Sequence, residues 1–267
     1  LASAPQKPLV LTIRDAAGRL VRRYSSADAA PKVDLATINH APEWSEPPSM
    51  LAATPGMHRF VWPLRYAAHS GGAYADGVWA PPGVDAGELA GDGRTLRQTL
   101  TVAPDPRLDL PAAAYAQEFA LARQVEALQV RLEAATREAG ALRKATAERR
   151  AAAGGDVAAA LDRFAARLAD VSGARAAPNP FNAWSFPPQD THTLAFVAQA
   201  LGELMGAVDG ADAAPSPDAR TGYAKLASLT DATLAAWDAF KRDDLATLNA
   251  SLRAANRKPI EAGGETP

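Results

Sequence analysis

The second half of the chain repeats apolar residues at alternating spacings of four and three. The longest series is made up of Leu121, Val125, Leu128, Leu132, Ala135, Ala139 and Leu142. Such spacing places all of these side chains along one face of an α-helix, as in a coiled coil. We therefore predict a helix from about residue 110 to residue 152, ended by the glycine pair at 154–155.

Two shorter segments have the same spacing and predict two more helices. One has its apolar series in residues 157–171 and ends at Gly173, and the other has it in residues 194–208 and ends at Gly210. Glycine is common just after the last turn of a helix, because it adopts a left-handed backbone without strain.

A last helical segment is predicted to begin at Ser216, a residue type that caps helix N-termini well. Its apolar stripe reaches Phe240 and changes phase before Leu245, so we predict that Asp243 or Asp244 caps a separate terminal helix. Four amphipathic helices with these seams favour an antiparallel four-helix bundle.

The first part of the chain has short stretches of alternating apolar and polar residues, bounded by turn residues. They predict strands at residues 9–14, 20–24, 58–62 and 95–102, the last paired with a strand around 87–90. Short strands at this spacing are typical of a small β-sandwich of the fibronectin III or immunoglobulin type.

Composition divides the chain near Pro106. Proline is concentrated before this residue and alanine after it, and these residues favour loops and helices respectively. We predict an α+β chain with a β-sandwich domain at residues 1–106 and a helical bundle domain at residues 107–267.

Charge and cysteine content exclude several function classes. A formal net charge of −2 removes the broad electrostatic attraction on which non-specific nucleic-acid binding depends. The chain has no cysteine, which excludes disulfides, thiolate metal sites and cysteine nucleophiles. It also has no apolar run of the length that spans a membrane.

The sequence contains no motif that predicts catalytic chemistry. The four histidines (His40, His58, His69 and His192) lack the spacing of a metal site, and no nucleophile motif or phosphate loop is present. We therefore predict no metal, no cofactor and no catalytic residue, so the chain is not predicted to be an enzyme.

A group of aromatic residues is the one candidate functional feature. Trp44, Trp62, Tyr66, Tyr74 and Trp79 lie within 36 residues, among glycines and prolines. They could fill the sandwich core, form the centre of a protein interface, or stack on sugar rings. The alternating pattern around Trp62 favours the core, whereas Trp44, Tyr66, Tyr74 and Trp79 are the candidates for an interface or a glycan platform.

The order of several landmarks resembles the C-terminal region of bacterial proteins whose N-terminal part is a sortilin-like or Asp-box (BNR) repeat β-propeller. The landmarks are the hairpin at residues 11–18, Trp44, and the segments 56–66, 81–83, 98–102, 105–107 and 244–252. Members of this group are often labelled glycosyl-hydrolase-like, and many are exported. This chain departs from the group at Asp85 and Gly87, which occupy expected inward positions of a strand that usually contains tyrosine.

The resemblance implies a function without catalysis. We expect an accessory or scaffolding module for protein interaction, taken from a longer extracytoplasmic protein, whose partner is the N-terminal propeller domain or another protein. The alternative is an accessory glycan-binding module of a secreted glycoside hydrolase. The chain begins with Leu1 rather than Met, which we interpret as the start of a mature or trimmed fragment.

Overall fold

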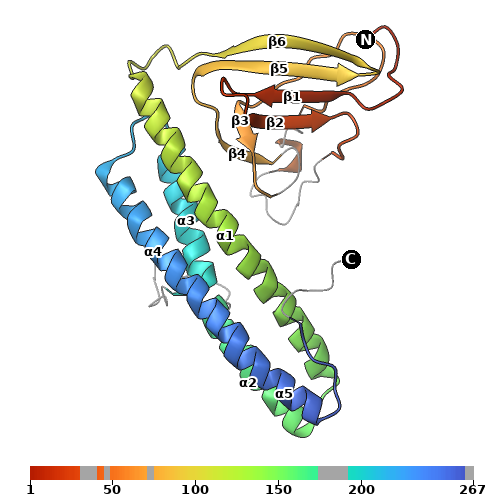
Figure 1. The fold of residues 1–267 in the computed structure, drawn as a ribbon, viewed down its shortest axis with the longest axis vertical. Helices are drawn as coiled ribbons and strands as arrows, with labels where there is room; N and C mark the ends of the chain where they lie inside the picture. The colour runs from red at the N-terminus through yellow and green to blue at the C-terminus, as the bar shows by residue number, and fades with distance from the viewer. Residues whose placement is uncertain (31–40, 45–48, 71–74, 174–191, 262–267) are drawn as a thin grey trace. The chain divides into compact units, whose positions relative to one another are not determined.

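The computed structural model describes residues 1–30, 41–44, 49–70, 75–173 and 192–261, and it shows an α+β chain with long helices and small antiparallel sheets (Figure 1). None of the helices in these ranges is long and apolar enough to cross a membrane.

The chain forms two compact units. The sheet unit consists of Leu1–Arg123 and Ala211–Ala214, and the helical unit consists of Gln124–Gly210 and Pro215–Pro267. The division therefore lies inside the first long helix, whereas the change from strands to helices lies near Pro106, where the sequence analysis places it. That Pro106 separates two independently folding domains stays a prediction.

The sheet unit contains one four-stranded and one two-stranded antiparallel sheet. The strands of the larger sheet lie in the order β2-β1-β5-β6, and those of the smaller are β3 and β4 (Figure 1). Their bounds are Val10–Arg14 for β1, Leu20–Ser25 for β2, Arg65–Ala67 for β3, Asp76–Trp79 for β4, Gly83–Gly91 for β5 and Arg94–Val102 for β6. A short 3₁₀ turn, η1, comprises Pro42–Trp44.

The hairpin of β5 and β6 has a two-residue turn, Asp92-Gly93. Both residues have positive φ angles, 46° and 77°, as a type I′ turn requires. The strands pair without interruption from Gly91 and Arg94 to Gly83 and Val102. The predicted pairing of 95–102 is thus confirmed, and its partner strand is longer than predicted despite Asp85 and Gly87.

The predicted strand at residues 58–62 is wrong. These residues form no strand, and the nearest paired segments are β3 and β4. Phe60 and Trp62 are more buried than their neighbours, so the alternation does report a partly covered face. Alternation does not report whether a neighbouring strand is present to pair with the backbone, and here none pairs.

The helical elements are α1 (Ala112–Ala151), α2 (Gly155–Ser172), α3 (Leu194–Val208), α4 (Pro217–Phe240), the π segment η3 (Lys241–Leu245) and α5 (Ala246–Ala254). The predicted end signals are confirmed at two helices. Gly173 has a φ of 79° directly after α2, and the Ser216 side chain accepts a hydrogen bond from the Ala219 N–H at the start of α4.

The predicted apolar seams are buried in the helices. All seven seam residues of α1 are at most 8% exposed, and the five of α3 at most 9%. In α2, Leu161, Phe164 and Leu168 are buried, whereas Val157 and Val171 at the ends of the series are partly exposed. The 4-3 spacing therefore identified the packed face of each helix.

The phase change after Phe240 has a cause that differs from the prediction. No separate helix is capped by Asp243 or Asp244, because η3 continues α4 directly into α5 as one turn of π-helix. A π turn holds one residue more than an α turn. It absorbs the five-residue step from Phe240 to Leu245 and keeps both residues buried, at 3% and 6% exposure.

We predict that charge is tolerated on one face of α1 only. Leu128→Asp places a carboxylate at a position that is 5% exposed, and it should cost about 3 kcal/mol or more of unfolding free energy. Val130→Asp, at a position 45% exposed on the same helix, should change the unfolding free energy by about 0.5 kcal/mol or less. Urea denaturation measures both free energies, and equal effects would contradict the prediction that the apolar seam is the buried face of α1.

We also predict that one residue can be deleted from η3 but not from α4. Deletion of Arg242 shortens the π turn to an α turn and leaves the stripe residues on one face, so the melting temperature should change little. Deletion of the exposed Ser228 rotates one half of the uninterrupted helix by about 100° against the other. The melting temperature of the Ser228 deletion should therefore lie well below that of the Arg242 deletion. The reverse order would refute the explanation that the π turn absorbs one extra residue.

Candidate functional site

The hairpin of β3 and β4 carries one of the two exposed tryptophans of the described residues. Trp79 is 42% exposed and lies directly opposite Arg65 in the strand register. The Arg65 guanidinium carbon lies 3.8 Å from the centre of the indole ring, and its Nη1 donates to the Gly77 carbonyl at 2.7 Å. This cation–π pair fixes the orientation of the indole and covers one of its faces.

Leu64, the residue before this hairpin, has a strained backbone. Its φ is 57°, a left-handed conformation that costs a residue with a Cβ about 1–2 kcal/mol. Its carbonyl accepts a hydrogen bond from the Ala80 N–H, which holds it next to the end of β4. The side chain is 40% exposed, so the strain presents an apolar group to solvent near Trp79. We call Leu64, Arg65 and Trp79 the hairpin patch.

The other aromatic candidates have different surroundings. Tyr66 lies in the core at 7% exposure, and its ring packs on Phe119 of α1 with centroids 5.2 Å apart. Trp44 is 78% exposed on η1. Trp62 is partly buried, and its Nε1 donates to the Arg65 carbonyl. Tyr74 lies outside the described residues.

A buried arginine attaches the hairpin to the large sheet. Arg22 on β2 is 1% exposed, and its Nη1 lies 2.6 Å from the Asp76 carboxylate on β4. The same guanidinium donates to the backbone carbonyls of Tyr66 and Ala75 at 3.3 and 2.9 Å. A planar group with five donors can bond several acceptors at once, and this one joins β2, β3 and β4.

Two aspartates lie at one end of the inner sheet face, which is the face that carries Ile13. Arg14 pairs with Ala86 in the register of β1 and β5, so the next step brings Asp15 opposite Asp85. Asp15 accepts hydrogen bonds from Arg19 at 2.7 Å and from the Tyr66 hydroxyl at 3.3 Å. Asp85 is 7% exposed, and its Oδ2 has no hydrogen-bond partner among the described residues.

The two carboxyls have opposite pKa shifts. Burial raises the pKa of Asp85, and the negative charge of Asp15 raises it further. Burial also works against the charged form of Asp15, but the bonds from Arg19 outweigh it, so the pKa of that carboxyl is lowered. Burial, with the Asp15 charge, raises the pKa of Tyr66 to about 12, which keeps its hydroxyl protonated as a donor.

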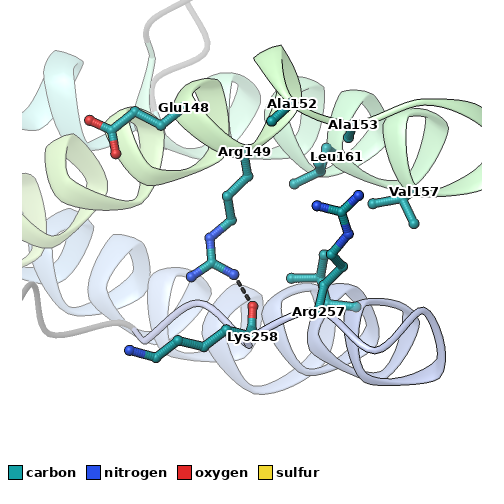
Figure 2. Close-up of a pocket in the computed structure, with 9 residues that line it drawn as sticks. Glu148, Arg149, Ala152, Ala153, Val157, Leu161, Arg257 and Lys258 are labelled. Carbon is teal, nitrogen blue, oxygen red and sulfur yellow. Dashed lines mark hydrogen bonds between the residues drawn. The ribbon is translucent and has the colours of Figure 1, made fainter.

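The helical unit contains a cavity of about 300 Å³ between α1, α2 and the segment after α5 (Figure 2). Arg149 extends across it from α1 and donates to the carbonyls of Lys258 and Pro259. Arg257 extends into it toward Val157 and Leu161 (Figure 2). The donors of Arg149 are thus used to hold the chain after α5, which is a structural role.

A polar cluster joins α1 to the end of α4. The Glu138 carboxylate accepts bonds from Trp237 Nε1 at 2.9 Å and from Lys241 Nζ at 2.8 Å. Burial opposes the charge of Glu138, but these two donors outweigh it and lower its pKa. The cluster satisfies the one polar atom of Trp237, whose side chain is 1% exposed.

Within the described ranges, no group of three or more histidine and acidic side chains could hold a metal ion. His58 lies in an exposed position with its Nε2 2.6 Å from the Thr54 carbonyl, and His40 lies outside those ranges.

Comparison with protein-family models, with curated proteins and with known structures found no match for this chain.

Trp79 was predictable from the sequence, whereas its surroundings were not. Nothing in the pattern predicts the left-handed backbone of Leu64 or the buried position of Arg22. One signal was present: two adjacent arginines, Arg22 and Arg23, occur in an alternating strand, so one of them has to point to the covered face. The alternation of its strand likewise predicted that Asp85 points inward, and the structure confirms that Asp85 is buried.

We predict that Asp85 destabilises the sheet unit at neutral pH. Its folded-state pKa is raised, so the folded state binds its proton more tightly than the unfolded state, and this stabilisation is lost as pH rises through the raised value. Asp85→Asn removes the unpartnered charge and should raise the unfolding free energy at pH 7 by about 1 kcal/mol.

The gain should shrink as pH falls and vanish below the ordinary aspartate pKa, because Asp85 is then protonated in both states. Asp212→Asn, at an exposed position, is the control and should show neither effect. Denaturation curves across this pH range check the prediction, and a loss of stability in Asp85→Asn at pH 7 would contradict it.

Proposed function

We propose that the chain is a non-catalytic interaction module. In this proposal the sheet unit is a fibronectin III-like sandwich that docks onto another protein domain through the hairpin patch. The helical unit is an antiparallel four-helix bundle that acts as a scaffold.

The distribution of exposed apolar side chains carries the proposal. Among the described large apolar residues that are exposed, the helical unit contributes only Val130. The sheet unit contributes Leu1, Leu20, Trp44, Met57, Val61, Leu64, Trp79, Val84, Leu96 and Leu108. A unit that exposes many large apolar side chains offers more apolar surface for binding than a unit that buries nearly all of them. This contrast supports docking through the sheet unit.

The hairpin patch has the composition of an interface centre. Tryptophan and arginine are the residues that most often dominate binding energy at protein interfaces. Here the two are already oriented against each other, so little side-chain entropy is lost on docking. The strain at Leu64 supports the same conclusion, since strained backbone is found preferentially where a side chain has to be presented.

The proposed partner is a β-propeller domain that precedes this chain in a longer, exported protein. This part of the proposal rests on the resemblance of the sequence landmarks. Arrangement as a scaffold beside such a domain needs a rigid extended element, and the 40-residue helix α1 supplies one.

A second candidate is an accessory glycan-binding module. The exposure of Trp44, at 78%, favours it, because an indole face in solvent can stack on a sugar ring. Trp79 favours it less, since Arg65 occupies one face of that ring. Affinity electrophoresis in gels that contain polysaccharide separates the two candidates: retardation that Trp44→Ala abolishes supports glycan binding.

The interaction is tested with the polypeptide encoded upstream of Leu1 in the same gene, produced separately and titrated with this chain by calorimetry. Leu64→Gly is the informative variant, because it removes the exposed side chain and also relieves the left-handed strain. It should keep or raise stability by up to about 1 kcal/mol and weaken binding about tenfold or more.

Trp79→Ala should weaken binding at least as much, and Val130→Ser in the helical unit is the matched control, which should bind as the unchanged chain does. Absence of binding to the upstream polypeptide, or equal binding by the Leu64→Gly variant and the control, would refute the proposal.

A further inference from the structure

Strand β6 is an open edge of the four-stranded sheet (Figure 1). Exposed edges are usually protected by proline, by a bulge, by charge or by shortness. β6 contains no proline, its register with β5 has no irregularity, and its nine residues carry only two charges, Arg94 and Arg97. From Arg94 to Thr99 every residue is exposed. The opposite edge strand, β2, is shorter and lies against β3.

The turn geometry defines which backbone groups of β6 face outward. In a two-residue hairpin, the residues that flank the turn, Gly91 and Arg94, are hydrogen-bonded to each other. Bonding direction alternates along a strand, so the N–H and C=O groups of every second residue after Arg94 face β5. The remaining residues, Thr95, Arg97, Thr99 and Thr101, direct theirs to the open edge. No backbone hydrogen bond among the described residues engages them from that side.

The inner face next to this edge also lacks cover. One row of side chains crosses the sheet through Tyr24, Leu11, Leu89 and Leu96, as the strand registers define it. Tyr24 at the β2 end is 1% exposed, and Leu96 at the β6 end is 68% exposed. The small hairpin attached by Arg22 packs at the β2 end, Leu11 and Leu89 are partly buried, and Leu96 at the β6 end is left in solvent.

We propose that β6 pairs antiparallel with β6 of a second copy of this chain, about a two-fold axis at Gln98. The sequence of the edge supports this occupant, because Thr95-Leu96-Arg97-Gln98-Thr99-Leu100-Thr101 reads almost the same in both directions. Leu96 then lies opposite Leu100 of the other copy, on the uncovered inner face.

The outward backbone groups match in this register. Thr95 lies opposite Thr101 of the other copy and Arg97 opposite Thr99, and all four direct their groups to the edge. Every outward N–H and C=O therefore meets an acceptor or a donor. The eight strands of two copies form one continuous sheet.

Side-chain pairing favours an axis at Gln98 over an axis one residue earlier or later. An axis at Arg97 would place two arginines directly opposite each other, which destabilises a strand pair. An axis at Thr99 would place Gln98 opposite Leu100 and lose the leucine pairs. With the axis at Gln98, each Arg97 lies opposite a threonine and keeps its own Glu88, 2.8 Å away on β5.

The register can be tested by crosslinking, because the chain has no cysteine of its own. Opposed residues of a pair that is not hydrogen-bonded have Cα atoms about 4.5 Å apart, within the range of a disulfide. Gln98→Cys lies on the proposed axis and should form a covalent dimer under mild oxidation. Thr101→Cys is the matched control, since its two copies would lie about 20 Å apart along the strands.

Association is measured on the full chain by sedimentation equilibrium. The unchanged protein should approach twice its 27.8 kDa mass as its concentration rises. Thr99→Pro removes an outward N–H that the hairpin itself does not use, so this variant should keep its sheet and remain at the monomer mass. A monomer at all concentrations, a dimer that Thr99→Pro leaves intact, or equal crosslinking of the two cysteine variants would overturn the proposal.

Discussion

One buried guanidinium determines how the sheet unit is arranged. Arg22 joins a strand of the large sheet to both strands of the small hairpin, through one carboxylate and two backbone carbonyls. A buried charge is costly unless its donors are satisfied, so the hairpin has to remain where these acceptors meet it. The position of Trp79 and Arg65, and therefore of the hairpin patch, depends on this attachment. The same attachment accounts for the decrease in cover along the row from Tyr24, which is 1% exposed, to Leu96, which is 68% exposed.

Periodicity predicted the helices much better than the small hairpin. The buried faces of α1 and α3 followed from spacing alone, because a helix in this chain buries one continuous stripe and almost nothing else. The π turn was visible in the sequence as a phase change, but a cap and an extra residue in a turn produce the same change in spacing. Only the hydrogen bonding of the backbone distinguishes them.

The candidate site was predicted only in part. Trp79 was identified because it belongs to a group of aromatic residues close together among glycines and prolines, and Tyr66 was identified for the same reason although it belongs to the core. Composition cannot separate them, since both lie on the same hairpin and differ only in the side of it that they face. No feature of the sequence pointed to Leu64 as part of the candidate site. Its carbonyl accepts from the Ala80 N–H, a contact between residues distant in sequence that no local pattern reports.

The difference between the two sheet edges limits what kind of assembly this chain could build. A subunit with two equivalent open edges can add a further subunit at each end and grow without limit, as fibrils do. Here β2 is shorter and lies against β3, so in the described part of the chain β6 is the one long open edge of the four-stranded sheet. A subunit with a single binding edge has a valency of one. Assembly through β6 would therefore end after one association step, because the opposite edge is shielded and not because proline interrupts the strand that binds.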